Sequence, residues 1–435
     1  MSPIVDGDFQ GDGSVYDSVK SALINFVKYM RGESNLKQSF GAIFLSILTD
    51  VLAGLFLGKL QETLLLLPGL IVLIPGSMSM RGNVFGALGS RLSTALHMGR
   101  IDHFSMKSKY IKNNIYSSIT LTIFTSIALG FVARALLLVF GFASASVPQL
   151  VLISFIGGLL SGLIILVITF GIAFVAHKKR WDPDNVTSPM ITALGDFFTI
   201  PLLMLAASFI LGVSGFYIMV MMVLVMVVAV VNLVMVFVSE SSHEALVLRE
   251  GSYRTIVLQS VIVMLLAGAL SSMAGLLLES NLRLLVTVPI IITLIPAFLE
   301  EGGNIGCILS SRLATRLNTG RMEGKIKLDD ELKKEVANSY ILSLLVFPTV
   351  SVFVYVAGSF IGIGGLSIVK LVYTATIAGL LLTTLAVAFS FVISAISFRH
   401  RINPDNVTIP LITGMTHILG VFTVLYVMEI FNILI

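Results

Sequence analysis

The sequence predicts an all-α polytopic membrane protein of about eleven transmembrane helices, arranged as two parallel five-helix repeats joined by one connector helix. Of its 435 residues, 56% are hydrophobic and only 12% are charged, which is too little polar surface for a soluble globule of this size. Apolar segments long enough for a hydrocarbon core of about 30 Å lie at 39–59, 64–95, 115–140, 149–176, 189–213, 216–238, 255–278, 284–315, 338–362, 369–397 and 409–433.

Two polar motifs occur twice in the chain with the same displacement. The segment 75–83 (PGSMSMRGN) recurs at 296–304 (PAFLEEGGN), and the segment 182–187 (DPDNVT) recurs at 403–408 (NPDNVT). Both pairs are 221 positions apart, so the chain contains two copies of one unit. We therefore divide it into a cytoplasmic N-terminal segment with an amphipathic helix (1–37), a first repeat (38–213), a connector helix with a cytoplasmic loop (214–254) and a second repeat (255–435).

The distribution of basic residues predicts the orientation in the cell membrane. With a cytoplasmic N-terminus, the loops on the inside hold most of the lysines and arginines, which satisfies the positive-inside rule: Arg100, Lys107, Lys109, Lys112, Lys178, Lys179, Arg180, Arg249, Arg254, Arg321, Lys325, Lys327, Lys333, Lys334, Arg399 and Arg401. The C-terminus is then outside. Because five spans are an odd number, the connector helix makes the two repeats parallel, related by a pseudo-twofold axis along the membrane normal. The net charge of +4 follows from this topology and predicts no nucleic-acid partner.

Asp196 is the strongest candidate for metal binding. It lies about two turns into the fifth span, and an intramembrane carboxylate by default marks an ion pathway. Ser188 and Thr192 precede it at intervals of four residues and share its helix face. One carboxylate with neutral oxygens suits Mg²⁺, which retains several waters. The alternative is a structural ion pair between Asp196 and Arg81.

Asn83 and Asn304 follow glycine within spans that we expect to be interrupted. Non-helical backbone at membrane depth is tolerated where it lines a water-filled cavity, so the two amides are candidates for lining the pathway. The alternative is that each amide ties one helix to the next.

Three further acids are candidates. Glu300 and Glu301 occur only in the second copy and either attract cations or are satisfied by helix ends or by Arg81. Asp50 on the first span is a candidate coupling-ion site, or else makes an interhelical hydrogen bond. The six histidines show no metal-ligand spacing, and we expect no cofactor and no catalytic residue.

The two motifs, with segment 90–94 (SRLST) and the stretch from Pro189 to Asp196, resemble the MgtE family of magnesium transporters. The likeness is to its tandem-repeat branch, which contains the eukaryotic solute-carrier magnesium transporters and their prokaryotic relatives. Bacterial members are homodimers with the ion path on the twofold axis between the second and fifth spans. The resemblance implies that this chain is such a dimer fused into one polypeptide and works as a monomer. It also implies that the cytoplasmic gate of the bacterial proteins is missing here.

The resemblance implies transport of a divalent metal cation, foremost Mg²⁺, with Mn²⁺, Co²⁺ and Zn²⁺ as other candidates, along the pseudo-twofold axis. The family's ion-binding acid on the fifth span corresponds to Asp196. In the second half, Thr413 corresponds to Thr192, but His417 stands in place of the acid. The alternatives are an exchanger coupled to Na⁺ or H⁺ and, more remotely, a membrane-embedded enzyme acting on a lipid phosphate.

Overall fold

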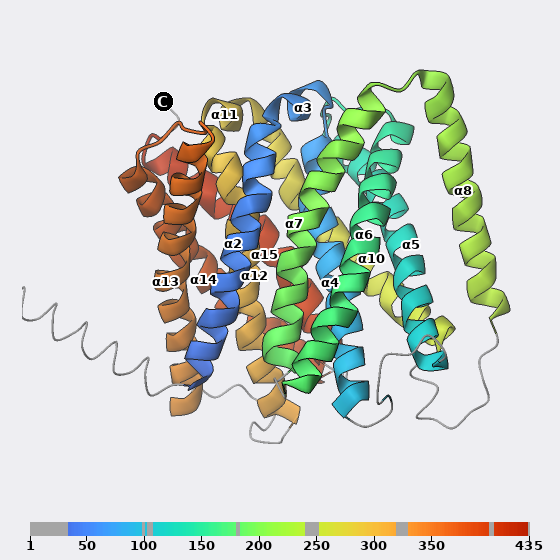
Figure 1. The fold of residues 1–435 in the computed structure, drawn as a ribbon. Helices are drawn as coiled ribbons and strands as arrows, with labels where there is room; N and C mark the ends of the chain where they lie inside the picture. Colours follow the sequence, from blue (N-terminus) through green and yellow to red (C-terminus); the bar gives the residue numbers. More distant parts are fainter. Residues whose placement is uncertain are drawn as a thin grey trace, which may run out of the picture.

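The computed structural model describes residues 34–97, 101, 108–179, 183–239, 252–318, 329–399 and 404–433, and every regular element within these ranges is a helix (Figure 1). The predicted amphipathic helix of the N-terminal segment and most of the basic loops lie outside these ranges. Side chains are also not described at 34–42, 93–94, 97, 183–189, 314–315, 318, 398–399 and 404–409.

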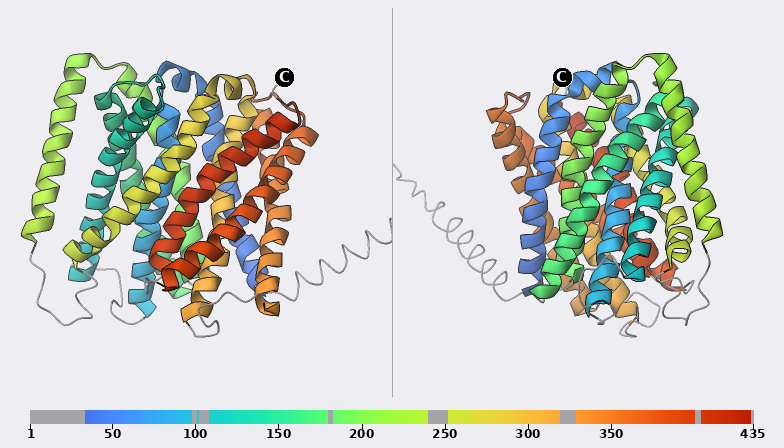
Figure 2. Two further views of the ribbon diagram at one scale, coloured as in Figure 1. Left: turned by 180° about the vertical axis from the view of Figure 1, so that it is seen from behind. Right: turned by 45° about the vertical axis from the view of Figure 1, so that its right-hand side comes forward.

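The helices follow the internal repeat of the sequence. The first repeat contains α2 (Ser34–Lys59), α3 (Gln61–Leu66), α4 (Leu70–His97), α5 (Lys109–Val139), α6 (Val147–Lys178) and α7 (Pro183–Leu211). The second contains α10 (Tyr253–Ser280), α11 (Leu282–Thr287), α12 (Pro289–Asn318), α13 (Asp330–Phe360), α14 (Ile368–Arg399) and α15 (Pro404–Ile430). Helices α11, α13 and α14 begin and end 221 residues after α3, α5 and α6. Figures 1 and 2 show that α2 and α10 both begin at the lower end of the bundle.

Nine helices within the described ranges are long and apolar enough to cross a membrane. These are α5, α6, α7, α10, α12, α13, α14, α15 and the connector α8 (Gly215–Val238). Helices α2 and α4, of 26 and 28 residues, lie in the same bundle. The chain is therefore an all-helical polytopic membrane protein.

The expected interruption of the spans at Asn83 and Asn304 is wrong. Helices α4 and α12 run without a break through both Gly-Asn pairs. The breaks come earlier, where α3 and α11 end before the longer helices begin, and Gly69 adopts φ of 86° at the first of them. Gly82 serves close helix packing instead, because a Cβ there would lie 3.0 Å from Cγ2 of Thr192 on α7.

Each repeat contributes its first helix to the contact between the two halves. Helix α2 packs against α7 of its own repeat and α12 of the other, and α10 packs against α15 and α4 in the same way. Glycines allow the backbones to approach: a Cβ at Gly54 would overlap the carbonyl oxygen of Thr293, and a Cβ at Gly275 would lie 2.6 Å from the Cα of Val72. Small residues are the usual means of close helix contact in membranes.

The connector α8 lies at the edge of the bundle (Figure 2). Only Ile218, Val225 and Val236 among its residues are buried. Its polar residue Asn232 accepts a hydrogen bond from Oγ1 of Thr120 on α5 at 3.1 Å. A helix that is apolar on all sides and covered on few of them suits a lipid environment.

Candidate ion site between α2, α7 and α12

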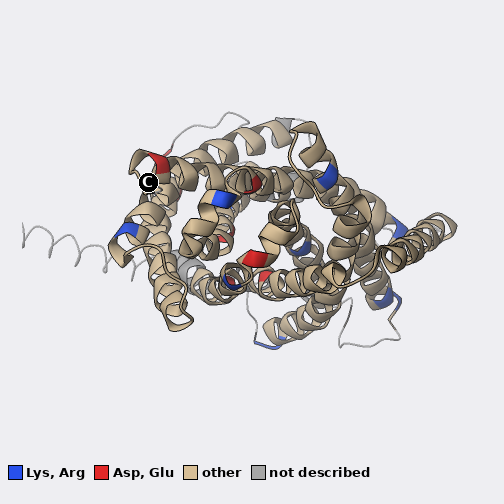
Figure 3. Ribbon diagram, turned by 90° about the horizontal axis from the view of Figure 1, so that it is seen from above, with Lys and Arg blue, Asp and Glu red and all other residues tan. Residues whose placement is uncertain are grey.

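Four carboxylates are buried inside the apolar bundle. They are Asp50 on α2, Asp196 on α7, and Glu300 and Glu301 on α12, with at most 4% of any residue exposed. Figure 3, seen from above, shows acidic positions inside the ring of helices. Asp50 interacts electrostatically with the other three, so the four groups form one cluster. Buried charges of one sign at membrane depth are costly and point to a cation pathway.

Asp196 and Glu300 form one half of this acidic cluster. Their carboxyl groups are within hydrogen-bonding reach of each other. Neither oxygen of Asp196 accepts a hydrogen bond from an N–H or O–H donor in the described ranges. Two carboxylates in contact repel one another, and a cation held between them removes that repulsion.

Asp50 and Glu301 form the other half. Oγ of Ser46 donates a hydrogen bond to Oδ2 of Asp50 at 2.9 Å and also interacts with the carboxyl group of Glu301. Nδ2 of Asn304 donates to Oε2 of Glu301 at 3.0 Å. The second oxygens, Oδ1 of Asp50 and Oε1 of Glu301, are buried without a hydrogen-bond partner. Asn304 therefore orients an acid of the cluster.

Arg81 does not neutralise the cluster, so the alternative of an ion pair with Asp196, Glu300 or Glu301 is wrong. Its guanidinium is buried and donates to the hydroxyl groups of Ser126 at 2.8 Å and Ser161 at 3.4 Å. No ion pair joins a basic side chain to any of the four acids within the described ranges. The cluster therefore keeps its negative charge for a cation.

The remaining predicted residues lie apart from the acids or cannot be placed. Nδ2 of Asn83 donates to Ser79 one turn back at 3.4 Å, and Thr413 contacts Sγ of Cys307 at 3.5 Å beside Gly303. His417 is buried with no partner on either ring nitrogen. The side chain of Ser188 lies outside the described part, so its role stays a prediction.

The second repeat contributes an equivalent interface that carries no carboxylate. A displacement of 221 residues relates Asp50 to Ser271, Asp196 to His417, Glu300 to Ser79 and Glu301 to Met80. Met80 packs against Gly268 of α10. All four acids therefore lie at one of two matched interfaces. The sequence signal that reveals this asymmetry is that each acid lacks an acidic counterpart.

The described part contains no set of three or more His, Cys, Asp or Glu side chains arranged to hold a metal. The acidic cluster is accordingly not a cage built of protein ligands alone. It matches the binding mode of Mg²⁺, which is usually held by one or two carboxylates and keeps several waters.

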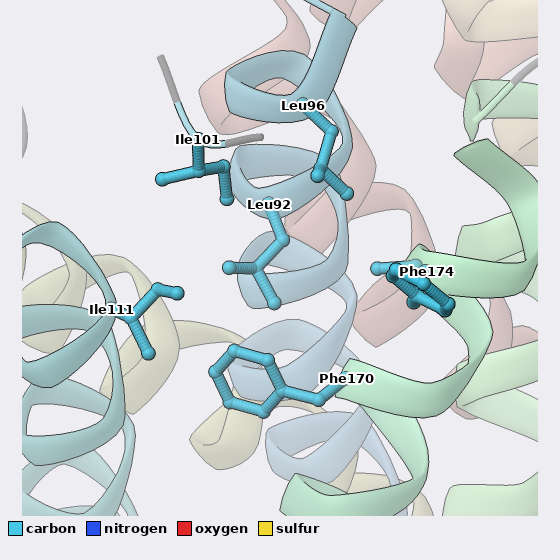
Figure 4. A pocket seen from close by; sticks show the side chains of 7 residues that line it. Leu92, Leu96, Ile101, Ile111, Phe170 and Phe174 are labelled. Carbon is cyan, nitrogen blue, oxygen red and sulfur yellow. The ribbon is translucent and has the colours of Figure 1, made fainter. Parts of the chain in front are cut away.

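A separate pocket between α4, α5 and α6 is apolar (Figure 4). Its lining consists of Leu92, Leu96, Ile101, Ile111, Phe170, Ala173 and Phe174. None of these side chains offers a ligand for an ion, so the pocket plays no part in the ion site.

An apolar helical bundle with carboxylates buried at its centre defines a membrane protein that binds cations within the bilayer. The family model of MgtE, described as a divalent cation transporter, matches residues 74–206 and again 295–427. This chain belongs to the MgtE family and contains two copies of its domain. The members of that family are transporters and not enzymes.

The chain is similar to several curated proteins. It is 24% identical over 400 residues to solute carrier family 41 member 3 of Rattus norvegicus, which covers 87% of this chain and 83% of the relative. It is 25% identical over 418 residues to solute carrier family 41 member 2 of Homo sapiens, which covers 88% of this chain and 70% of the relative. No solved structure shows significant similarity to it.

Proposed function

We propose that this protein carries Mg²⁺ across the cell membrane through a path between the two repeats. The observation that supports this function is the cluster of four buried carboxylates with no basic partner in the described part. Asp196 is the principal metal ligand and Glu300 assists it. Thr192, Thr413, Ser188 and Asn83 hold waters of the ion's hydration shell along the pseudo-twofold axis.

The proposed membrane arrangement is five spans, one connector and five spans, with the N-terminus cytoplasmic and the C-terminus outside. The repeats extend over 38–213 and 255–435, and α8 crosses the membrane between them as part of 214–254. The close backbone contacts of α2 with α12 and of α10 with α4 support this arrangement, because they bring both repeats of one chain together. A single chain is then the transporting unit.

Flux into liposomes containing only the purified protein tests this function. We expect Mg²⁺ entry with wild-type protein and loss of that entry in Asp196→Asn, which keeps the shape of the side chain and removes its charge. Glu429→Gln is the matched control, because it neutralises an exposed acid at the end of α15. Wild-type flux in a folded Asp196→Asn protein would contradict the assignment.

Coupled exchange is the second candidate function. The number of acids favours it, because four buried carboxylates exceed the one or two that hold a Mg²⁺ ion. The same liposomes distinguish the two mechanisms: Mg²⁺ entry without any other gradient supports a channel, and entry that requires a Na⁺ or pH gradient supports an exchanger.

A further inference from the structure

We propose that Asp50 of α2 and Glu301 of α12 form a second divalent-cation site, beside the site at Asp196 and Glu300, so that one chain binds two ions at the same depth. The identity of the ion rests on the proposed function. The existence and location of the second site rest on the geometry of the α2 and α12 interface.

Two neighbouring residues of one helix direct their acids to different partners. Successive residues on an α-helix are about 100° apart around its axis and rise by only about 1.5 Å. Glu300 accordingly meets Asp196 on α7, while Glu301 meets Ser46 and Asp50 on α2. The two carboxylate pairs lie side by side in the bundle and not one above the other along the membrane normal.

The oxygens of the second pair are arranged to receive a ligand. Neutral donors, Ser46 and Asn304, each hold one oxygen of an acid in place. Oδ1 of Asp50 and Oε1 of Glu301 remain buried with no donor. A buried carboxylate oxygen without a partner is costly, so these two oxygens mark where a cation is missing.

The charge of the pair selects a divalent ion. No basic side chain of the described part pairs with either acid, so the ionised pair carries two negative charges in an apolar surrounding. A monovalent cation leaves one of those charges uncompensated, whereas a divalent cation removes both. Two carboxylates completed by water are also a normal ligand set for Mg²⁺.

The equivalent interface of the other repeat shows that the acids are not needed for packing. There, α10 meets α4 with Ser271 in place of Asp50 and Met80 in place of Glu301. Met80 fills its position against Gly268. The same pair of helices therefore associates with an apolar contact at this point, and the acids of the first interface serve another purpose.

The two sites oppose each other electrostatically. Asp50 interacts with Asp196 and with Glu300, so an ion bound at either pair reduces the attraction for an ion at the other. This coupling is reciprocal by thermodynamic necessity. Entry of a second ion thereby loosens the first, which meets the requirement that a conducting site also release its ion.

Titration of the purified full-length chain with Mn²⁺, with free Mn²⁺ followed by electron paramagnetic resonance, tests the proposal. We expect two ions per chain, the second bound at least about tenfold more weakly than the first. Asp50→Ser and Glu301→Met install the residues of the equivalent interface, which the fold tolerates, and each should leave one ion per chain. Ser271→Ala is the matched control and should keep two.

The outcomes separate the two proposals. One ion per chain in the wild type that disappears in Asp196→Asn and persists in Asp50→Ser overturns the second site and leaves the proposed function standing. One ion that remains in Asp196→Asn and disappears in Asp50→Ser places binding at the second pair and contradicts the principal role of Asp196. A wild-type chain that binds no Mn²⁺ or Mg²⁺ overturns both.

Discussion

Gly54 holds α2 against α12, and its replacement by alanine should disable ion transport. A Cβ at this position would overlap the carbonyl oxygen of Thr293 and lie 3.0 Å from its carbonyl carbon. Both atoms belong to the backbone, so no side-chain rotation relieves the contact and the helices must separate. Gly54 lies one helical turn after Asp50, so the separation moves Asp50 away from Glu301.

The expected magnitude follows from the clash. Overpacking by one methyl group typically costs about 1–3 kcal/mol, and a loss of about 1.4 kcal/mol in ion binding is a tenfold loss of affinity. We therefore expect Gly54→Ala to lower divalent-cation flux in proteoliposomes at least about tenfold. Thermal melting of the purified protein should show a modest loss of stability in parallel.

Gly275→Ala is the control that separates stability from function. Gly275 is the equivalent of Gly54, and its Cβ would lie 2.6 Å from the Cα and 2.8 Å from the carbonyl oxygen of Val72. It imposes a similar clash at the interface that has no acids, so it should lower stability alike while keeping flux within a few-fold of wild type. Equal loss of flux in both variants would refute the reasoning that only one interface handles the ion.

Three other variants test separate features. Gly158→Ala places a methyl group against the guanidinium of Arg81 and should lower stability by about 2–3 kcal/mol in chemical unfolding; an unchanged midpoint would contradict this. Asn232→Leu removes the hydrogen bond between α8 and Thr120 and should cost about 1 kcal/mol with transport within a few-fold of wild type; loss of flux in a stable variant would give α8 a direct role. His417→Asp should tighten Mn²⁺ binding and slow release, and unchanged affinity would place His417 away from the ion.

The fold was largely predictable from the sequence because its two main signals are physical constraints. Apolar segments in a bilayer must be helical to satisfy their backbone groups, and the constant displacement of 221 residues fixes which segments correspond. The prediction failed where glycine was interpreted as a helix breaker. Gly82 lies within α4, where its small size permits close contact with Thr192. Glycine has both roles in membranes, and sequence alone does not distinguish them.

The site was predictable in its members but not in its pairing. Asp196, Glu300, Glu301 and Asp50 were each identifiable as acids in apolar segments. That Asp50 meets Glu301 across the two repeats depends on how α2 packs against α12, and no local motif encodes it. Arg81 occupies the position equivalent to Gly302, beside the acids in the aligned motif, but in space it binds serines of α5 and α6.

Both signs of buried charge are distributed asymmetrically between the repeats, and this follows from the fusion of two units into one chain. Two identical subunits would carry every buried charge twice, so an acid on one interface would appear on the other. Here the pocket that holds Arg81 in the first repeat is lined in the second by Phe347 and Leu382, in place of Ser126 and Ser161. The acids are confined to the interface of α2 with α7 and α12. An entering cation therefore meets one attractive interface and one without negative charge, so the ion should bind off the pseudo-twofold axis, closer to α12 than to α4.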